Sequence, residues 1–251
     1  MHAGFNARFF DEETAAYESA TQCSLVLPLA FGLVPENHRP AVTRNLVRNI
    51  MEQHKGHTSV GLIGTQWQMQ VLTDTGHPEA AWSIATRTER PSWGYMIANG
   101  ATTIWERWDT DTQEGGMNGE SQKILSGNFE AWCYQTLAGI NYDPQVPGFK
   151  YVIFRPHLVG DLRWVRASHE SLFGQIQSDW KIDEGIFRWQ ITVPANTTAT
   201  VYVPTTNTSK TIEFNQVTEH SPHVTRTGVG DMHVIYQVGS GNYEWTSPWI
   251  K

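Results

Sequence analysis

The sequence predicts a chain of two parts, an α-helical part followed by a β part. Through about the first 140 residues, apolar side chains recur at every third or fourth position, which is the spacing of helices with one buried face. Beyond residue 150, apolar and polar residues alternate, as they do in half-buried strands. Prolines and a glycine between the two patterns indicate a linker. We therefore expect helical residues 1–142, a linker at 141–149 and β residues 150–251.

The clearest helix follows Pro40, a residue suited to the first helical turn. Val42, Leu46 and Ile50 recur at every fourth position, so they lie on one face. The other helices are expected at residues 11–31, 63–73, 78–86 and 120–138. Pro28 should kink the first of them, and the last should end at Gly139. Residues 63–73 and 78–86 should form an antiparallel pair. Glycine-rich connections at 56–65 and 94–103 are the places where a helical scaffold usually carries its site.

The β part shows its two-residue period most clearly at Phe187–Val193. Further strands are expected at 151–154, 162–167, 176–180, 201–203, 211–214 and 233–238, separated by turn residues. Several short strands at this spacing are typical of an antiparallel β-sandwich.

Composition limits the classes of protein that this chain can belong to. With 251 residues, 39% of them hydrophobic, and a formal net charge of −7, the chain can bury a large core and is poorly suited to bind nucleic acid or an anionic membrane. No leader peptide or membrane-length apolar run is visible, which suits the cytoplasm, whereas an additional N-terminal region could direct secretion or export to the periplasm. Cys23 and Cys133 are expected to be buried thiols rather than a disulfide.

The segment Pro91–Asp109 concentrates tryptophan and acidic residues. Glu106 lies between Trp105 and Trp108. Sugar rings stack their apolar faces on indole and offer hydroxyls to carboxylates, so this grouping is typical of a carbohydrate pocket. The alternative is that Glu106 is an ion-paired structural residue of a helical core.

The motifs PSWGYM, GATTIWERWD, GGMNGESQK and AWCYQTLAGI resemble late segments of the catalytic domain of bacterial α-L-rhamnosidases. The resemblance extends from about Phe5 to beyond Pro204. It implies the C-terminal portion of an (α/α)6 six-hairpin barrel followed by a β-sandwich. It also implies inverting hydrolysis of terminal α-L-rhamnosyl residues without a cofactor.

Inverting hydrolysis needs a carboxylate base that activates water and a carboxylic acid that protonates the leaving oxygen. The resemblance places Glu106 as the general base. The acid lies earlier in that family's barrel and has no counterpart here, so we expect a partial chain. Its partners would be a rhamnosylated small molecule or oligosaccharide, and the N-terminal part of the enzyme or a second copy. The alternative is a non-catalytic carbohydrate-binding protein derived from such an enzyme.

Other residues are candidates for contacts with the sugar. Trp67, Trp93 and Trp108 are expected to line the pocket, the first two from loops, although large aromatic residues more often belong to a core. Glu120 is a candidate sugar ligand or, with Ser121, a helix cap. Many family members carry an Asn-His pair where this chain has Gln122 and Lys123, and Lys123 can donate hydrogen bonds to hydroxyls.

Metal binding is not predicted. His54 and His57 are three positions apart, but no carboxylate or cysteine completes a zinc set, so solvated histidines at a helix end are expected. No dense acidic loop suggests calcium. Asp109 is expected to cap a helix or to orient a neighbour.

Overall fold

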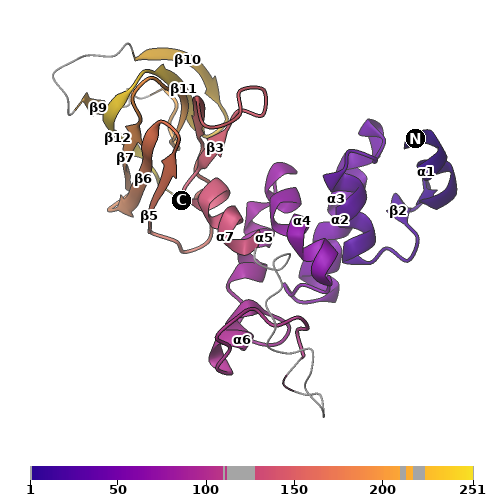
Figure 1. The fold of residues 1–251 in the computed structure, drawn as a ribbon. Coiled ribbons are helices and arrows are strands. Elements are labelled where there is room, and N and C mark those ends of the chain that lie inside the picture. The colour runs from indigo at the N-terminus through magenta and orange to yellow at the C-terminus, as the bar shows by residue number, and fades with distance from the viewer. Residues whose placement is uncertain (1, 110, 112–127, 210–212, 217–223, 251) are drawn as a thin grey trace. The chain divides into compact units, whose positions relative to one another are not determined.

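A computed structural model describes residues 2–109, 111, 128–209, 213–216 and 224–250. The chain divides into two compact units, Met1–Trp132 and Cys133–Lys251. The first contains the α-helices and the second contains the two large sheets (Figure 1). The predicted order of a helical part followed by a β part is therefore confirmed.

The helical unit begins with α1 (His2–Phe9) and a two-stranded hairpin of β1 (Phe10–Asp11) and β2 (Ala16–Tyr17). The helices that follow are α2 (Gln22–Ala30), η1 (Glu36–His38), α3 (Arg39–Arg48), η2 (Asn49–Gln53), α4 (Leu62–Asp74), α5 (Pro78–Ala85), α6 (Trp93–Ala98) and α7 (Asn128–Trp132). Contacts between α2 and α4, α4 and α5, and α4 and α7 place α4 at the centre of this unit.

The second helix starts later than the sequence predicts. Instead of beginning at Asp11, α2 begins at Gln22, where the Thr21 hydroxyl accepts the backbone N–H of Ser24 as an N-cap. Asp11 lies in the hairpin, and its carboxylate accepts the backbone N–H of Glu13 at 2.9 Å. This local bond favours a turn over a helix. Pro28 does lie inside α2, as expected.

The apolar face predicted after Pro40 is present. Val42, Leu46 and Ile50 are all fully buried. The helix that carries them is not α-helical throughout, because α3 ends at Arg48 and the chain continues from Asn49 as the π-helical turn η2. The predicted antiparallel pair at 63–73 and 78–86 corresponds to α4 and α5.

The two tryptophans that were predicted to lie in loops lie in helices. Trp67 belongs to α4, and Trp93 opens α6, so the connection predicted at 94–103 begins inside a helix. Ser92 caps α6 by accepting the N–H of Tyr95 at 3.0 Å. The first turn of α6 packs against the backbone at Arg87, and this requires glycine at position 94. A Cβ at this position would lie 2.4 Å from the carbonyl oxygen of Arg87.

The β unit contains two five-stranded sheets within its described residues. One has the order β10 (Thr225–Gly230), β11 (His233–Val238), β8 (Thr198–Pro204), β4 (Tyr151–Phe154) and β3 (Ile140–Tyr142). The other has the order β5 (Trp164–Ser171), β6 (Gly174–Asp183), β7 (Ile186–Val193), β12 (Gly241–Pro248) and β9 (Glu213–Gln216). The pairs are antiparallel except β4 with β8, which is parallel.

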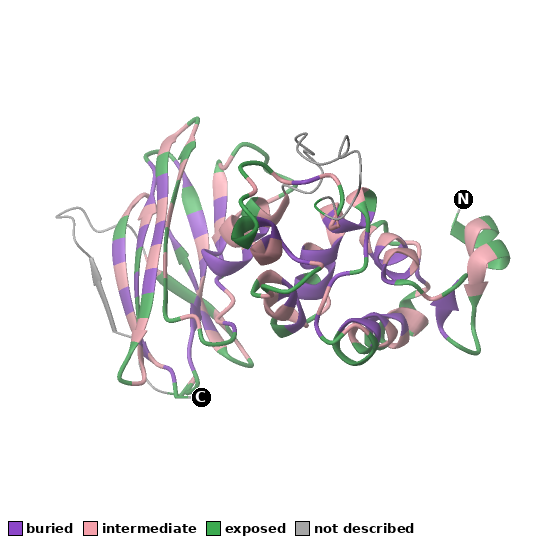
Figure 2. Ribbon diagram, turned by 90° about the horizontal axis from the view of Figure 1, so that it is seen from below, coloured by how far each residue is buried: buried purple, intermediate pink, exposed green. Residues whose placement is uncertain are grey.

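The two sheets pack face to face. Phe154 of the first sheet contacts Trp189 of the second, with ring centroids 6.1 Å apart, and Tyr236 contacts Trp245 at 4.7 Å. Burial alternates along these strands, so one side chain in two enters the core (Figure 2). The predicted sandwich is therefore present.

The start of the predicted linker is a strand. Asn141 and Tyr142 lie in β3, where they pair with Ile153 and Val152 of β4. The short π-helical segment η5 (Cys133–Leu137) precedes β3, and Gly139 lies between them with a φ of +74°. A Cβ at Gly139 would lie 2.2 Å from the backbone nitrogen of Pro156, so only glycine fits. Among the described residues, no helix is both long and apolar enough to cross a membrane.

Candidate active site

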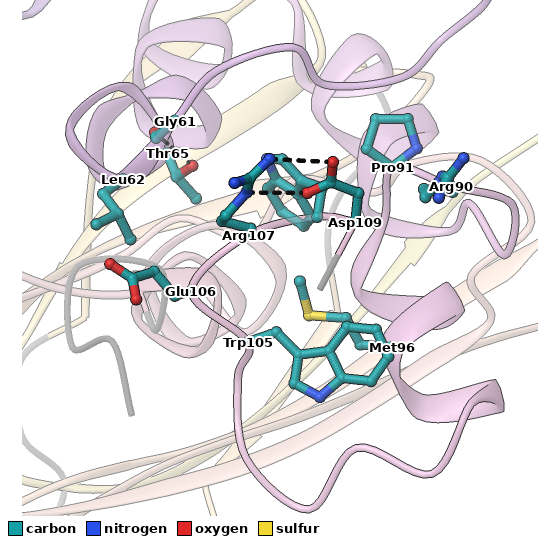
Figure 3. A pocket seen from close by; sticks show the side chains of 11 residues that line it. Gly61, Leu62, Thr65, Arg90, Pro91, Met96, Trp105, Glu106, Arg107 and Asp109 are labelled. Atoms are coloured by element: carbon teal, nitrogen blue, oxygen red, sulfur yellow. Dashed lines mark hydrogen bonds and ion pairs between the residues drawn. The ribbon is translucent and has the colours of Figure 1, made fainter. Parts of the chain in front are cut away.

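A cavity of about 440 Å³ opens in the helical unit beside the segment that the sequence analysis selected. Its walls come from the start of α4, from the residues before and within α6, and from the irregular segment 105–109 (Figure 3). The eleven lining residues are Gly61, Leu62, Thr65, Arg90, Pro91, Met96, Trp105, Glu106, Arg107, Trp108 and Asp109. The volume lies within the range of about 300–1,000 Å³ that is usual for pockets that bind small molecules.

Glu106 and Trp105 point in different directions from neighbouring positions. The carboxylate of Glu106 lies on the side of Leu62, whereas the indole of Trp105 lies beside Met96 (Figure 3). Trp105 is buried and Glu106 is partly exposed. The tryptophan therefore anchors the segment in the core while the carboxylate remains within reach of a ligand.

Arg107 and Asp109 form a two-pronged ion pair at the rim of the cavity. Nε of Arg107 lies 3.1 Å from Oδ1 of Asp109, and Nη2 lies 3.2 Å from Oδ2. Both side chains are more than two-fifths exposed, so solvent screens their attraction. The paired geometry fixes the direction of the two groups relative to one another. A role of Asp109 in orienting a neighbour stays a prediction.

Trp108 joins this segment to a distant loop. Its indole N–H donates a hydrogen bond to the carbonyl oxygen of Val60 at 2.8 Å. Its ring also meets Trp93 edge to face, with centroids 5.4 Å apart, and Trp93 in turn contacts Phe129 of α7. Trp108 therefore lines the cavity while Trp93 supports it from the core.

A buried hydrogen-bond network holds the loop that receives Trp108. The Gln68 amide donates to the Gln22 side-chain oxygen at 2.7 Å and accepts from the Thr58 hydroxyl at 2.7 Å. The Gln22 side chain also accepts the backbone N–H of Ser59 at 2.8 Å and donates to the carbonyl of His57 at 3.1 Å. Because these amides are buried and hydrogen-bonded both to each other and to the loop, they hold the backbone of residues 57–60 against α2 and α4.

The predicted site residues divide into three groups. Glu106 and Trp108 line the cavity, and Trp93 lies behind it. Trp67 contacts Phe31 at a ring distance of 5.2 Å and does not line the cavity among the described residues. Glu120 and Lys123 lie outside the described residues.

Sequence reasoning missed several cavity residues, namely Leu62, Thr65, Arg90 and Met96. Leu62 and Thr65 belong to the glycine-rich connection that was expected to carry a site and to the first turn of α4. Arg90 directly precedes the selected segment. Their positions, in or next to segments selected from the sequence, could therefore have identified these cavity residues, whereas their residue types could not.

Histidines and cysteines are further groups of this chain that could bind a metal ion. In the described part of the chain, no three histidine, cysteine or acidic residues are grouped as metal ligands. The half-buried rings of His54 and His57 each place Nδ1 near a backbone carbonyl, at 3.0 and 3.1 Å. Cys23 and Cys133 are thiols and do not form a disulfide, as expected, but both are only partly buried. Burial raises the pKa of the Cys23 thiol.

Comparison with known proteins gives the class of this protein. Residues 1–137 match the model described as the bacterial alpha-L-rhamnosidase 6 hairpin glycosidase domain, and residues 139–218 match the bacterial alpha-L-rhamnosidase C-terminal domain. The helical unit that carries this tryptophan-lined cavity therefore belongs to the six-hairpin glycosidase domain family. The chain belongs to the bacterial alpha-L-rhamnosidase family.

Individual relatives agree with this assignment. An alpha-L-rhamnosidase of Streptomyces avermitilis is 34% identical over 230 residues, which is 90% of this chain and 21% of the relative. One from an Alteromonas species is 32% identical over 80% of this chain and 22% of its own length. This chain thus spans about a fifth of the length of these curated relatives.

Solved structures of the same family have the same fold. The crystal structure of Streptomyces avermitilis alpha-L-rhamnosidase complexed with L-rhamnose has a TM-score of 0.88 at 32% identity, over 100% of this chain and 23% of that chain. The alpha-L-rhamnosidase from Dictyoglumus thermophilum has a TM-score of 0.82 at 32% identity, over 98% of this chain and 27% of that chain.

Proposed function

We propose that this chain carries the general base of an inverting α-L-rhamnosidase, and that Glu106 is that base. The observation that supports this most directly is the position of its carboxylate in the cavity wall, on a segment fixed by Trp105 and Trp108. A base that must deprotonate water needs a fixed position and access to solvent, and Glu106 has both.

The proposed reaction is hydrolysis of a terminal α-L-rhamnosyl residue. Glu106 takes a proton from a water molecule, whose oxygen attacks the anomeric carbon as the bond to the leaving oxygen breaks. A carboxylic acid on the opposite face returns a proton to that oxygen. In inverting enzymes the two carboxyl groups are roughly 6.5–9.5 Å apart, which leaves room for the water. We propose that the acid lies outside these 251 residues.

The cavity walls suit a 6-deoxy sugar. Leu62, Met96 and Trp108 offer apolar surface for the sugar ring and its methyl group. Arg90 and Thr65 offer hydrogen bonds for the hydroxyls. Direct sugar contacts by Trp67, Glu120 and Lys123 remain predictions. The substrates would be rhamnosylated small molecules or oligosaccharides, with the rest of the enzyme or a second copy completing the site.

Two substrates test the base separately from the acid. α-L-Rhamnosyl fluoride releases fluoride, which needs no proton donor, whereas a methyl α-L-rhamnoside needs one. We expect the chain to hydrolyse the fluoride and not the methyl glycoside, and to give β-L-rhamnose first, as seen by proton NMR. Changing Glu106→Gln should lower the rate on the fluoride about 10²- to 10⁴-fold, the usual contribution of a general base.

The control is Glu12→Gln, which makes the same chemical change at an exposed position away from the cavity. It should leave the rate unchanged. If wild type and Glu106→Gln hydrolyse the fluoride equally, Glu106 is not the base. If both bind L-rhamnose and neither hydrolyses the fluoride, the non-catalytic carbohydrate-binding alternative is supported instead.

A further inference from the structure

The β unit carries a second groove, of about 560 Å³, on the outer face of the sheet that contains β5, β6, β7 and β12. The side chains of this face point away from the sandwich core, because they alternate with the buried residues of the same strands. All of its lining residues belong to the β unit, so this groove shares no lining residue with the cavity around Glu106.

One large aromatic side chain is exposed in this groove. Trp164, at the start of edge strand β5, has 66% of its surface exposed. A ligand can cover such an exposed tryptophan without disrupting contacts in the core. An exposed indole face is a common platform for a sugar ring.

The residues beside Trp164 form a row across the sheet. Trp164 pairs with Lys181 of β6, Lys181 with Arg188 of β7, and Arg188 with Thr246 of β12. Lys181 and Arg188 are both exposed. Side chains directly opposite on antiparallel strands lie about 5 Å apart at Cβ, so two like charges here repel one another.

Neither cation has a carboxylate partner within 4 Å in the described part of the chain. The neighbouring row differs, because there Arg166 is paired with Asp179 at 3.4 Å. An anion placed between Lys181 and Arg188 would remove their repulsion. The row therefore combines a stacking surface with an unfilled position for negative charge.

The neighbouring row adds groups that bind hydroxyls. Gln190 and Glu244 pair across β7 and β12, and both line the groove. Arg166 has 80% of its side chain exposed despite its ion pair. An amide, a carboxylate and a guanidinium together provide both donors and acceptors, as a polyhydroxylated ligand requires.

We propose that this face binds an acidic saccharide, with one sugar ring stacked on Trp164 and a carboxylate or sulfate between Lys181 and Arg188. An interface with another protein domain would be centred on a cluster of apolar side chains. Here a single indole lies among charged and amide groups, so a saccharide fits better. Such a site would hold the protein on an acidic glycan independently of any hydrolysis at Glu106.

Binding of defined oligosaccharides to the 251-residue chain by isothermal titration calorimetry tests the proposal. The probes are tetragalacturonate, its methyl ester and a sulfated carrageenan tetrasaccharide. The ester keeps the sugar rings of tetragalacturonate and removes their charges. We expect binding of at least one acidic probe, with little binding of the ester, and affinity that falls as salt rises. Comparison of the two acidic probes distinguishes a preference for carboxylate from one for sulfate.

Variants assign the contacts. Trp164→Ala, and Lys181→Gln with Arg188→Gln, should each weaken binding roughly tenfold or more, because loss of one stacking or charge contact of about 1.4 kcal/mol is a factor of ten. Leu172→Ala is the matched control for Trp164, since Leu172 is 92% exposed and lies outside the groove. Lys55→Gln is the control for charge, at an exposed position of the helical unit. Circular dichroism checks the fold of each variant.

The proposal fails if neither acidic probe binds the wild-type chain. It also fails if Trp164→Ala binds as tightly as Leu172→Ala, or if tetragalacturonate binds and its methyl ester binds equally well. None of these results bears on the hydrolysis of α-L-rhamnosyl fluoride, so the two proposals can fail separately.

Discussion

The indole N–H of Trp108 and the carbonyl oxygen of Val60 are joined by a hydrogen bond of 2.8 Å across 48 positions of the chain. This bond connects the segment that carries Glu106 to the loop before α4. The same loop supplies Gly61 to the cavity wall. The position of the proposed base therefore depends on a residue remote from it in sequence.

Changing Trp108→Phe removes this bond and keeps an aromatic ring. We expect the helical unit to lose about 1 kcal/mol of unfolding free energy, the typical net value of one hydrogen bond. Urea titration followed by helical circular dichroism measures this loss of stability. The affinity of the variant for L-rhamnose should also be lower. Trp67→Phe is the control, since its ring contact with Phe31 can persist. Equal stability of the two variants would show that the bond to Val60 contributes nothing.

Changing Gln68→Met should destabilise the helical unit more strongly. Gln68 is buried, and its loss leaves the Thr58 hydroxyl without its acceptor and the Gln22 side chain with one donor fewer. An unsatisfied buried polar group costs about 1–3 kcal/mol. Gln66→Met, on the same helix but only partly buried, should cost little. Faster amide hydrogen exchange at residues 57–60 in the Gln68 variant alone would confirm that the network holds this loop, and unchanged exchange would contradict it.

Changing Ser178→Ala tests the polar centre of the β-sandwich. The Ser178 hydroxyl accepts the indole N–H of Trp189 at 2.9 Å and donates to the carbonyl of Ala138 at 2.6 Å, and it is fully buried. Its removal leaves two buried groups unpaired, so we expect a loss of about 2 kcal/mol. Thermal unfolding followed by tryptophan fluorescence measures it. Ser168→Ala, exposed on β5, should leave the transition in place.

The stability of the β unit should fall in mild acid. Burial, assisted by the nearby charge of Arg155, lowers the pKa of His157 to about 4 from an ordinary value of 6.5. Between these two pH values His157 is protonated in the unfolded chain and neutral in the folded chain. The free energy of unfolding therefore decreases as pH falls from 6.5 to about 4. Above pH 6.5 the group is neutral in both states and contributes no pH dependence.

His157→Gln should flatten this dependence in urea titrations followed by tryptophan fluorescence. Burial also lowers the pKa of His233, which contributes in the same direction. The single variant should therefore keep part of the slope, and the double variant with His233→Gln should keep less. A single variant with the full wild-type slope would exclude His157 as a source of acid sensitivity.

Local pattern was sufficient for much of the fold. The alternation in Tyr151–Phe154 and His233–Val238 gave the bounds of β4 and β11, and the four-residue repeat after Pro40 gave the buried face of α3. Strand β10 was missed because its sequence, TRTGVG, contains two glycines and only one large apolar residue. Strand β12 was missed although Tyr243 and Trp245 alternate, because glycine and asparagine at its start suggest a turn.

By itself the sequence determined the family, the order of the two parts and the segment that holds Glu106, because each of these is written in contiguous residues. The tertiary structure decided that Trp108 is bonded to Val60, that Met96 and Leu62 complete the cavity, and that Trp67 packs on Phe31 instead. It also set Lys181 opposite Arg188 beside Trp164. The physical reason is that periodicity encodes which face of an element is buried, whereas the partners across that face are selected by packing between segments far apart in the chain.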